Sequence, residues 1–185
     1  MNMREKLIRA AIDLIDREGL SGFGIRSAAA ECGVSCAAPY KHFKNKDDLF
    51  LAVLDYVNRQ WYAVQTGVAA ATEGSIPDQL AAIGLAYIKF NTENPQFRAV
   101  VMLRDDDMTP EQKAKKAEMS AFSQQLISKW CLKAGCNQEQ SERKTFAIRS
   151  FVFGAVRMLD SGELKYCPKT MEMVEKCIRR EFELD

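Results

Sequence analysis

The chain has 185 residues, 47% of them apolar and 28% charged, a composition that is typical of a globular protein and excludes a disordered one. The 26 lysines and arginines nearly balance the 25 aspartates and glutamates, which excludes a polybasic protein that coats nucleic acid by bulk charge. At this length we expect one domain, or one small domain fused to a larger one.

The N-terminal residues are charged every few positions, and no stretch of the sequence approaches the roughly 18 consecutive apolar residues of a membrane helix. We therefore expect a cytoplasmic protein without membrane contact, whose six cysteines are reduced thiols. The cysteines form no Cys-x-x-Cys pair, and the single histidine, His42, completes no familiar zinc pattern, so we predict neither a metal nor a cofactor. The sequence also lacks a glycine-rich phosphate loop, a nucleophile elbow and a helix with paired carboxylates. It therefore predicts no enzymatic activity and no catalytic residue.

Apolar residues recur at helical spacing along the chain, and no stretch of useful length alternates as a strand would. In chain order, helices are expected near 3–18, 25–32 and 36–43, and a long fourth helix opens at Asn45 or Lys46. After a break over 71–78, further helices are expected near 80–94, 95–103, 110–134, 138–161 and 169–182. The sequence therefore predicts an all-α fold of about nine helices.

Several helix ends carry local signals. Thr109 followed three residues later by Gln112, and Asn137 followed by Gln140, predict N-terminal capping boxes. Gly19 predicts the C-terminal cap of the first helix.

The first three predicted helices are too short to form a large core of their own. We therefore predict an N-terminal helix-turn-helix domain over 1–48 and a larger helical domain over 49–185. An acidic run at 105–107 is expected to be a solvated loop.

Residues 24–50 form the most informative segment, because two short helices separated by Gly-Val-Ser are typical of a helix-turn-helix. Ala29 is small where the second helix must cross closely. Gly33 can take the positive φ that a tight turn needs, and Val34 can fill the space between the helices. Ser35 is a natural cap for the second, recognition helix.

Hydrogen-bond donors follow the turn at once. Tyr40, Lys41, His42 and Lys46 lie within seven residues, and a helix start at Lys46 can aim backbone N–H groups at a phosphate. Residues 1–46 contain eight lysines or arginines and five acidic residues, so the local charge is moderately positive. These features favour contact with DNA through few phosphates per subunit.

The motif resembles the DNA-binding domain of the TetR family of transcriptional regulators over about residues 5–55. The residues that carry the resemblance are Ala29, Gly33, Val34, Ser35, Tyr40, His42, Phe43, Lys46, Asp48 and Leu49. The resemblance implies a ligand-responsive regulator, usually a repressor, that binds a two-fold operator as a homodimer and is released by a small-molecule effector.

The resemblance also implies roles by position. Phosphate contacts are implied for Tyr40, His42 and Lys46, and a core position for Phe43. The side chains that would face the major groove are those of Cys36, Ala37, Ala38 and Lys41. The complete predicted DNA-binding set is Arg26, Ser27, Ser35, Cys36, Ala37, Ala38, Tyr40, Lys41, His42 and Lys46.

Three positions depart from the family pattern. Gly24 stands where a capping threonine is frequent, and Cys36 stands where a lysine or arginine is frequent. Pro39 replaces an aliphatic residue. The three departures bear on the strength of phosphate anchoring and leave the motif itself intact.

The second domain is predicted to hold the effector, in the cavity that the resemblance implies between the fourth and seventh helices. Large side chains and a few polar groups are the expected lining. The predicted pocket residues are Trp61, Tyr62, Tyr87, Phe90, Asn91, Phe97, Met102, Phe122, Gln125, Arg149 and Phe153. The same aromatic residues are equally typical of an ordinary core.

In its second half, the helix over 138–161 is apolar around most of its circumference, and the helix over 169–182 has an apolar stripe of its own. A four-helix bundle made of these two helices from each of two subunits would bury both. The predicted dimer contacts are Phe151, Gly154, Ala155, Met158, Met171, Val174 and Ile178.

Two other functions fit the sequence less well. Cys36 at the start of a recognition helix is compatible with a regulator that senses oxidants or electrophiles through a cysteine. A helical interaction module that does not read DNA is the other alternative, because a short alanine-rich hairpin is a weak motif by itself.

Overall fold

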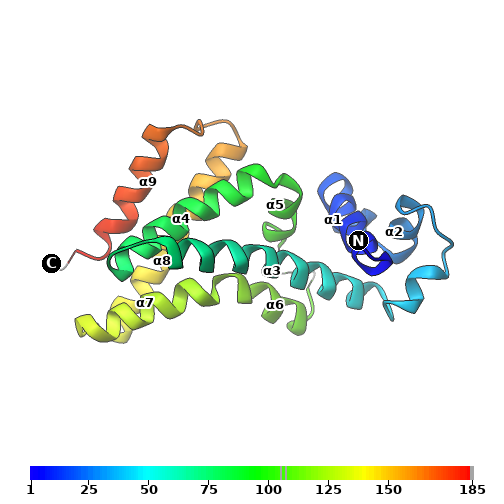
Figure 1. The fold of residues 1–185 in the computed structure, drawn as a ribbon, viewed down its shortest axis with the longest axis horizontal. Coiled ribbons are helices and arrows are strands. Elements are labelled where there is room, and N and C mark those ends of the chain that lie inside the picture. The colour runs from blue at the N-terminus through cyan, green and yellow to red at the C-terminus, as the bar shows by residue number, and fades with distance from the viewer. Residues whose placement is uncertain (105, 107, 184–185) are drawn as a thin grey trace. The chain divides into compact units, whose positions relative to one another are not determined.

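The computed structural model describes residues 1–104, 106 and 108–183, and Figure 1 shows their course. Its α-helices are α1 (Met3–Gly22), α2 (Ile25–Glu31), α3 (Lys46–Ala71), α4 (Ile76–Glu93), α5 (Pro95–Val101), α6 (Pro110–Ala117), α7 (Ala121–Ala134), α8 (Gln138–Asp160) and α9 (Pro168–Arg180). The described residues contain no strand, so the predicted all-α fold is confirmed. Of the acidic run at 105–107, only Asp106 is described, so the loop expected there otherwise lies outside the described residues.

The chain divides into two compact units. Unit 1 comprises 1–60 and 94–119, and unit 2 comprises 61–93 and 120–185. The division falls inside α3, so this one helix belongs to both units. The functional boundary predicted at residue 48 therefore differs from the division by packing, which adds the first half of α3, α5 and α6 to the N-terminal helices.

Unit 1 is built around α1. Its buried face repeats at helical spacing through Leu7, Ala11, Leu14 and Ile15, and it packs against α2 and α5. Gly19 adopts a left-handed φ of 68°, where the sequence predicts the helix end, but one further turn continues to Gly22.

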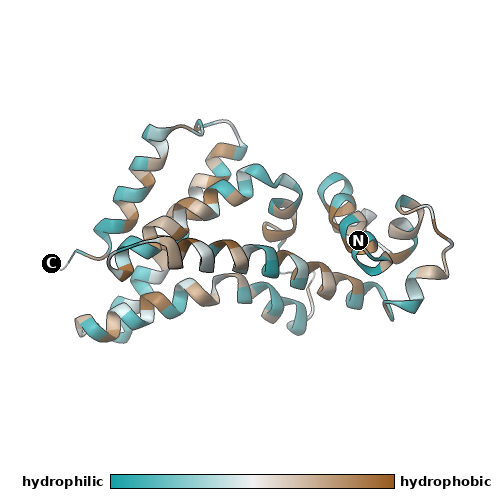
Figure 2. Cartoon of the chain, viewed as in Figure 1, coloured by the Kyte–Doolittle hydropathy of each residue, from teal (hydrophilic) through white to brown (hydrophobic). Residues whose placement is uncertain are grey.

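Unit 2 is built around α4, which packs against α7, α8 and α9. Gly84 lies where α4 meets two neighbours, because a Cβ atom built there would overlap the Ile178 side chain and stand 3.2 Å from Val152. Figure 2 shows hydrophobic and hydrophilic residues alternating along α9, which is the pattern of a helix that covers the core with one face. No helix in the described part of the chain combines the length and the apolar character needed to cross a membrane.

The two predicted capping boxes are present. The Thr109 and Asn137 side chains accept from the backbone N–H groups of Gln112 and Gln140, whose side chains in turn accept from the backbone N–H groups of Thr109 and Asn137. One long helix over 110–134 was predicted, but a 3-10 turn at Glu118–Ser120 separates α6 from α7.

Candidate functional site

The turn between α2 and the recognition segment has the predicted geometry. Gly33 takes a φ of 65°, and the N–H groups of Gly33 and Val34 donate to the carbonyl oxygens of Ala30 and Ala29, both at 3.0 Å. A Cβ on Gly33 would meet no atom of the residues that the structure describes within 4 Å, so the backbone angle and not lack of space requires glycine here. Ala29 is fully buried at the crossing of the helices.

The recognition segment itself is shorter and tighter than predicted. An α-helix over 36–43 was expected with Ser35 as its cap, but the structure has a 3-10 helix at Ala38–Lys41 that has no side-chain cap. Pro39 has no N–H group to donate back along the chain, and the N–H of Ala38 bonds to the carbonyl of Ser35 in the 3-10 pattern at 3.0 Å. The Pro39 ring is buried, which fixes the segment on the domain.

Side chains of the predicted DNA-binding set face outward in unit 1. Ser27 and Ala38 are half-buried, and the other members are exposed. The Tyr40 side chain is 53% exposed although it is large and aromatic. Beside it, Phe43 is buried, as the family resemblance implies, and the Arg4 guanidinium lies 5.3 Å from its ring centroid. The segment thus presents small groups followed by a phenol, an amine and an imidazole.

Lys46 begins α3, and contacts within unit 1 hold its side chain in place. Its Nζ donates to the Leu20 carbonyl oxygen at 3.1 Å and lies 5.3 Å from the ring centroid of Phe23. Asn45 caps the helix, because its Oδ1 accepts from the backbone N–H of Asp48 at 2.9 Å. The start of α3 is therefore well defined, and the Lys46 side chain is positioned beside it.

The first turn of α3 is also tied to α6. The Gln112 side chain accepts from the Thr109 N–H at 2.9 Å and donates to the Asp47 carboxylate at 3.1 Å. Gln112 is buried, so this amide joins the starts of two helices within unit 1. By contrast, Gly24 at the start of α2 provides no side-chain cap, which agrees with its departure from the family pattern.

Part of the predicted pocket set forms a cluster inside unit 2. The Trp61 ring on α3 lies 5.2 Å from Tyr87 and 5.5 Å from Phe90 on α4, measured between ring centroids. Tyr87 in turn lies 5.6 Å from Phe153 on α8. Asn91 is fully buried one helical turn after Tyr87.

The rest of the predicted pocket set does not join this cluster. Tyr62 and Phe122 pair with each other at 6.2 Å in unit 2, and Gln125 is exposed on α7. Phe97 and Met102 belong to unit 1, where Phe97 packs against Tyr56 at 6.1 Å between ring centroids.

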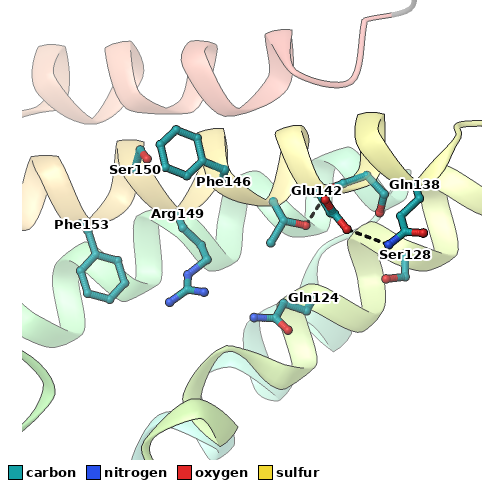
Figure 3. A pocket seen from close by; sticks show the side chains of 10 residues that line it. Gln124, Ser128, Gln138, Glu142, Phe146, Arg149, Ser150 and Phe153 are labelled. Carbon is teal, nitrogen blue, oxygen red and sulfur yellow. Dashed lines mark hydrogen bonds between the residues drawn. The ribbon is translucent and has the colours of Figure 1, made fainter. Parts of the chain in front are cut away.

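An open pocket of about 710 Å³ lies between α7 and α8 in unit 2 (Figure 3). Arg149 and Phe153 of the predicted set line it, together with Gln124 and Ser128 from α7. The Arg149 guanidinium carbon lies 5.9 Å from the Phe153 ring centroid. The pocket therefore borders the ring that touches Tyr87.

Sequence reasoning missed Gln65, which is 1% exposed on α3 in unit 2. No donor among the described residues reaches its Oε1. The position of Gln65 four residues after Trp61 places both on one face of α3, and this spacing was the signal available in the sequence.

The predicted dimer residues fall into two groups. Ala155, Val174 and Ile178 are buried within unit 2 itself, whereas Met158 is 39% exposed. The remaining members are half-buried, and they are Phe151, Gly154 and Met171. A contact with a second subunit must therefore use Met158 and the half-buried residues, because the chain already covers the other three.

The comparisons with known proteins agree with this geometry. Residues 7–53 match the family model described as bacterial regulatory proteins of the tetR family. The HTH-type transcriptional regulator YerO of Bacillus subtilis (strain 168) is 38% identical over 53 residues, which cover 29% of this chain and 18% of YerO. The family-model match spans most of α1, all of α2 and the first part of α3.

The fold likeness extends over nearly the whole chain. A TetR family transcription regulator from Marinobacter aquaeolei VT8 has a TM-score of 0.79 at 16% identity, with 96% of this chain and 94% of that chain covered. The fatty acid degradation regulator FadR from Bacillus halodurans has a TM-score of 0.77 at 13% identity, with 98% and 95% covered. The N-terminal segment of this chain is thus similar to the tetR family of bacterial regulatory proteins, and the chain shares the fold of solved TetR family structures.

Proposed function

We propose that the protein is a repressor that binds a two-fold operator as a homodimer and leaves it when a small molecule binds in unit 2. The observation that carries the DNA-binding part is the outward-facing group of Tyr40, Lys41 and His42 on a turn that Gly33 and Pro39 hold in place. Phenol, amine and imidazole groups bind phosphate, and the small side chains before them leave room for base edges.

Few side chains in one N-terminal helix-turn-helix domain (referred to below as a head) can read bases. Lys41 is the only lysine or arginine between Ser35 and His42, and the other exposed groups at the start of the segment are Cys36 and Ala37. Thymine methyl groups and one guanine or phosphate are the natural partners of such a surface. Two heads on a two-fold site double this limited readout, which supports a dimer.

The ligand response is supported by α3, which begins at Lys46 and continues into unit 2, where it carries Trp61 and Gln65. A ligand that favours another position of α3 in unit 2 would move the start of the same helix in unit 1. Binding of the effector would then change the distance between the two heads of a dimer. An effector that changed neither this distance nor the operator affinity would refute this mechanism.

Selection of bound DNA from a random pool tests the proposal most directly. We expect a two-fold sequence, bound by the parent protein and by Lys89→Ala, whose lysine is exposed in unit 2. Lys41→Ala combined with Tyr40→Ala should abolish the sequence-specific gel shift. A parent protein that enriches no sequence would instead favour an interaction module that does not read DNA.

A cysteine-based response is a second candidate, because Cys36 is exposed within the recognition segment. Modification there would add bulk to the face proposed to meet DNA. Mild peroxide should then abolish operator binding by the parent but not by Cys36→Ser. Equal loss in both proteins would dismiss this cysteine as the sensor.

A further inference from the structure

The aromatic cluster of unit 2 contains buried oxygens that no described protein group satisfies. They are the Oδ1 of Asn91 on α4 and the Oε1 of Gln65 on α3. Burying such groups without a partner costs free energy, so natural cores rarely keep them without a reason. A ligand that completes these bonds is such a reason, and this inference rests on the effector site proposed above.

The orientation of Asn91 shows which kind of group is missing. Its Nδ2 donates to the carbonyl oxygen of Tyr87 at 2.8 Å. Turning the amide around would place Asn91 Oδ1 against the Tyr87 carbonyl oxygen, so the unsatisfied atom is the side-chain oxygen of Asn91 and not its amide nitrogen. An oxygen of this type only accepts, and the group that completes it must therefore be an N–H or O–H donor.

The surroundings of Asn91 are aromatic and contain a positive charge at one border. The rings of Trp61, Tyr87 and Phe153 follow one another at centroid distances of 5.2 and 5.6 Å. Burial raises the pKa of Tyr87, while a hydrogen bond with the Asn91 side chain and the charge of Arg149 oppose this rise, so both groups act on the same hydroxyl.

Arg149 and Phe153 also line the open pocket between α7 and α8. Figure 3 shows both side chains extending from α8, whereas Glu142 lies farther along the helix, where it accepts from Gln138 at 2.9 Å. The Phe153 ring, with the Arg149 guanidinium beside it, thus lies between the lining of this pocket and the Tyr87 ring. A cation would meet like charge there, and an uncharged ring would not.

We propose that the effector is an uncharged aromatic compound whose N–H or O–H group donates to Asn91 Oδ1, with its ring among Trp61, Tyr87 and Phe153. Phe153 moves aside to admit the compound from the pocket between α7 and α8. Apolar rings provide the affinity, and the single acceptor selects compounds that carry a donor.

Matched pairs of probes test this proposal on the full-length parent protein. Indole and 1-methylindole differ by one N–H group, and phenol and anisole differ by one O–H group. Calorimetric titration should show each donor compound binding about tenfold tighter than its methylated partner, because the methylated compound leaves the buried acceptor unpaired. The planar cation 1-methylquinolinium should bind more weakly than indole.

Two leucine variants of buried amides locate the acceptor. In Asn91→Leu the donor and methylated probes should bind equally well, whereas Asn58→Leu, which removes a buried amide of α3 in unit 1, should keep the preference. Thermal unfolding of both variants checks that they fold. If Asn91→Leu does not fold, the comparison of the probe pairs on the parent protein still decides the question of the donor.

Four results would overturn the proposal: no probe binding up to millimolar concentration, equal binding of paired probes to the parent, tighter binding of the cation, or a preference that survives in Asn91→Leu. Operator binding by the same samples is measured in parallel. Selective binding of indole without release of DNA would support the ligand class and refute the proposed release. A parent protein that binds operator but no probe would refute the ligand class alone.

Discussion

Lys46 shows how one side chain can serve the fold and a ligand together. An ammonium group has three hydrogens, and the structure assigns one of them to the Leu20 carbonyl at 3.1 Å. The contact with the Phe23 ring uses the charge and no particular hydrogen. Two N–H groups are left for a phosphate, so the phosphate contact that the family resemblance implies does not require the internal contact to break.

Replacing this lysine should therefore weaken binding to every DNA sequence in a similar way. For Lys46→Gln we expect lower operator affinity and a salt dependence whose slope falls by about 1 for each phosphate that the variant no longer neutralises. Fluorescence anisotropy at several salt concentrations measures both. Arg59→Gln, which removes an exposed cation paired with Asp55 in unit 1, should leave the slope unchanged. Equal slopes in Lys46→Gln and the parent would refute the phosphate contact.

At the scale of helices, replacing glycine by alanine at two positions should change the free energy of unfolding in opposite directions. A methyl group at Gly84 would overlap the Ile178 side chain, whereas a methyl group at Gly67 on α3 would meet no atom of the described residues within 4 Å. Gly84→Ala should cost about 1–3 kcal/mol of the free energy of unfolding through overpacking. Gly67→Ala should add about 0.5–1 kcal/mol by restricting the unfolded chain and favouring the helix.

Urea denaturation of both variants and the parent provides the measurement. The two glycines differ in their surroundings and share a helical backbone, so the sign of the change reports on packing alone. A stabilised Gly84→Ala would show that α4 does not approach α8 and α9 as closely as described.

The start of α4 makes the stability of unit 2 sensitive to acid. The Ser75 hydroxyl, followed by the Arg179 guanidinium of α9, holds the pKa of Asp78 below its ordinary value. A depressed pKa in the folded state contributes stability that is present above the unfolded value of about 3.9 and disappears as the pH falls through the folded value. The stability of the parent should therefore fall below about pH 4.

Asp78→Asn should remove this part of the acid dependence. Thermal unfolding between neutral pH and pH 3 should show a smaller decrease of the melting temperature for the variant than for the parent, starting from a lower value at neutral pH because the variant cannot form the ion pair with Arg179. Identical pH profiles would show that Asp78 is not the group that titrates.

At the scale of the whole molecule, a substitution at Gly154 can test the association of two chains without changing the stability of each chain. A Cβ atom at this position on α8 would meet no atom of another described residue within 4 Å. Gly154→Leu should therefore fold but hinder the dimer contact that the sequence predicts at this position of α8. Sedimentation should show a monomer for the variant and a dimer for the parent. The operator affinity of the variant should be lower than that of the parent because the dimer is lost.

Gly67→Leu offers the matched control, since that glycine also has open space but lies on α3. It should sediment like the parent. If Gly154→Leu also remained dimeric, α8 would not be the dimer contact.

Local features were the part of this fold that the sequence could predict. The capping boxes at Thr109 and Asn137 and the positive φ of Gly33 depend on residues within one turn of each other, and all three are present. The recognition segment was predicted as an α-helix because proline is tolerated in a first turn. The buried Pro39 ring and the 3-10 bonds around it show that tertiary packing decided otherwise.

Burial was harder to predict than helicity. Val174 and Ile178 belong to an apolar stripe that fits either a core or a dimer contact, and only the packing of α9 on α4 distinguishes the two. Gln65 was overlooked because a polar residue on a long helix is usually exposed, and its burial follows from neighbours distant in sequence.

The double role of Gln112 has a consequence for communication within unit 1. One buried amide stabilises the first turn of α6 and also binds Asp47, the neighbour of Lys46. A force that rotates α6 would thus pull on the residue beside the proposed phosphate contact, without any change in the shape of the reading turn. Gln112→Ala should remove this connection. The variant would still bind DNA, but a movement of α6 would no longer change the position of Asp47.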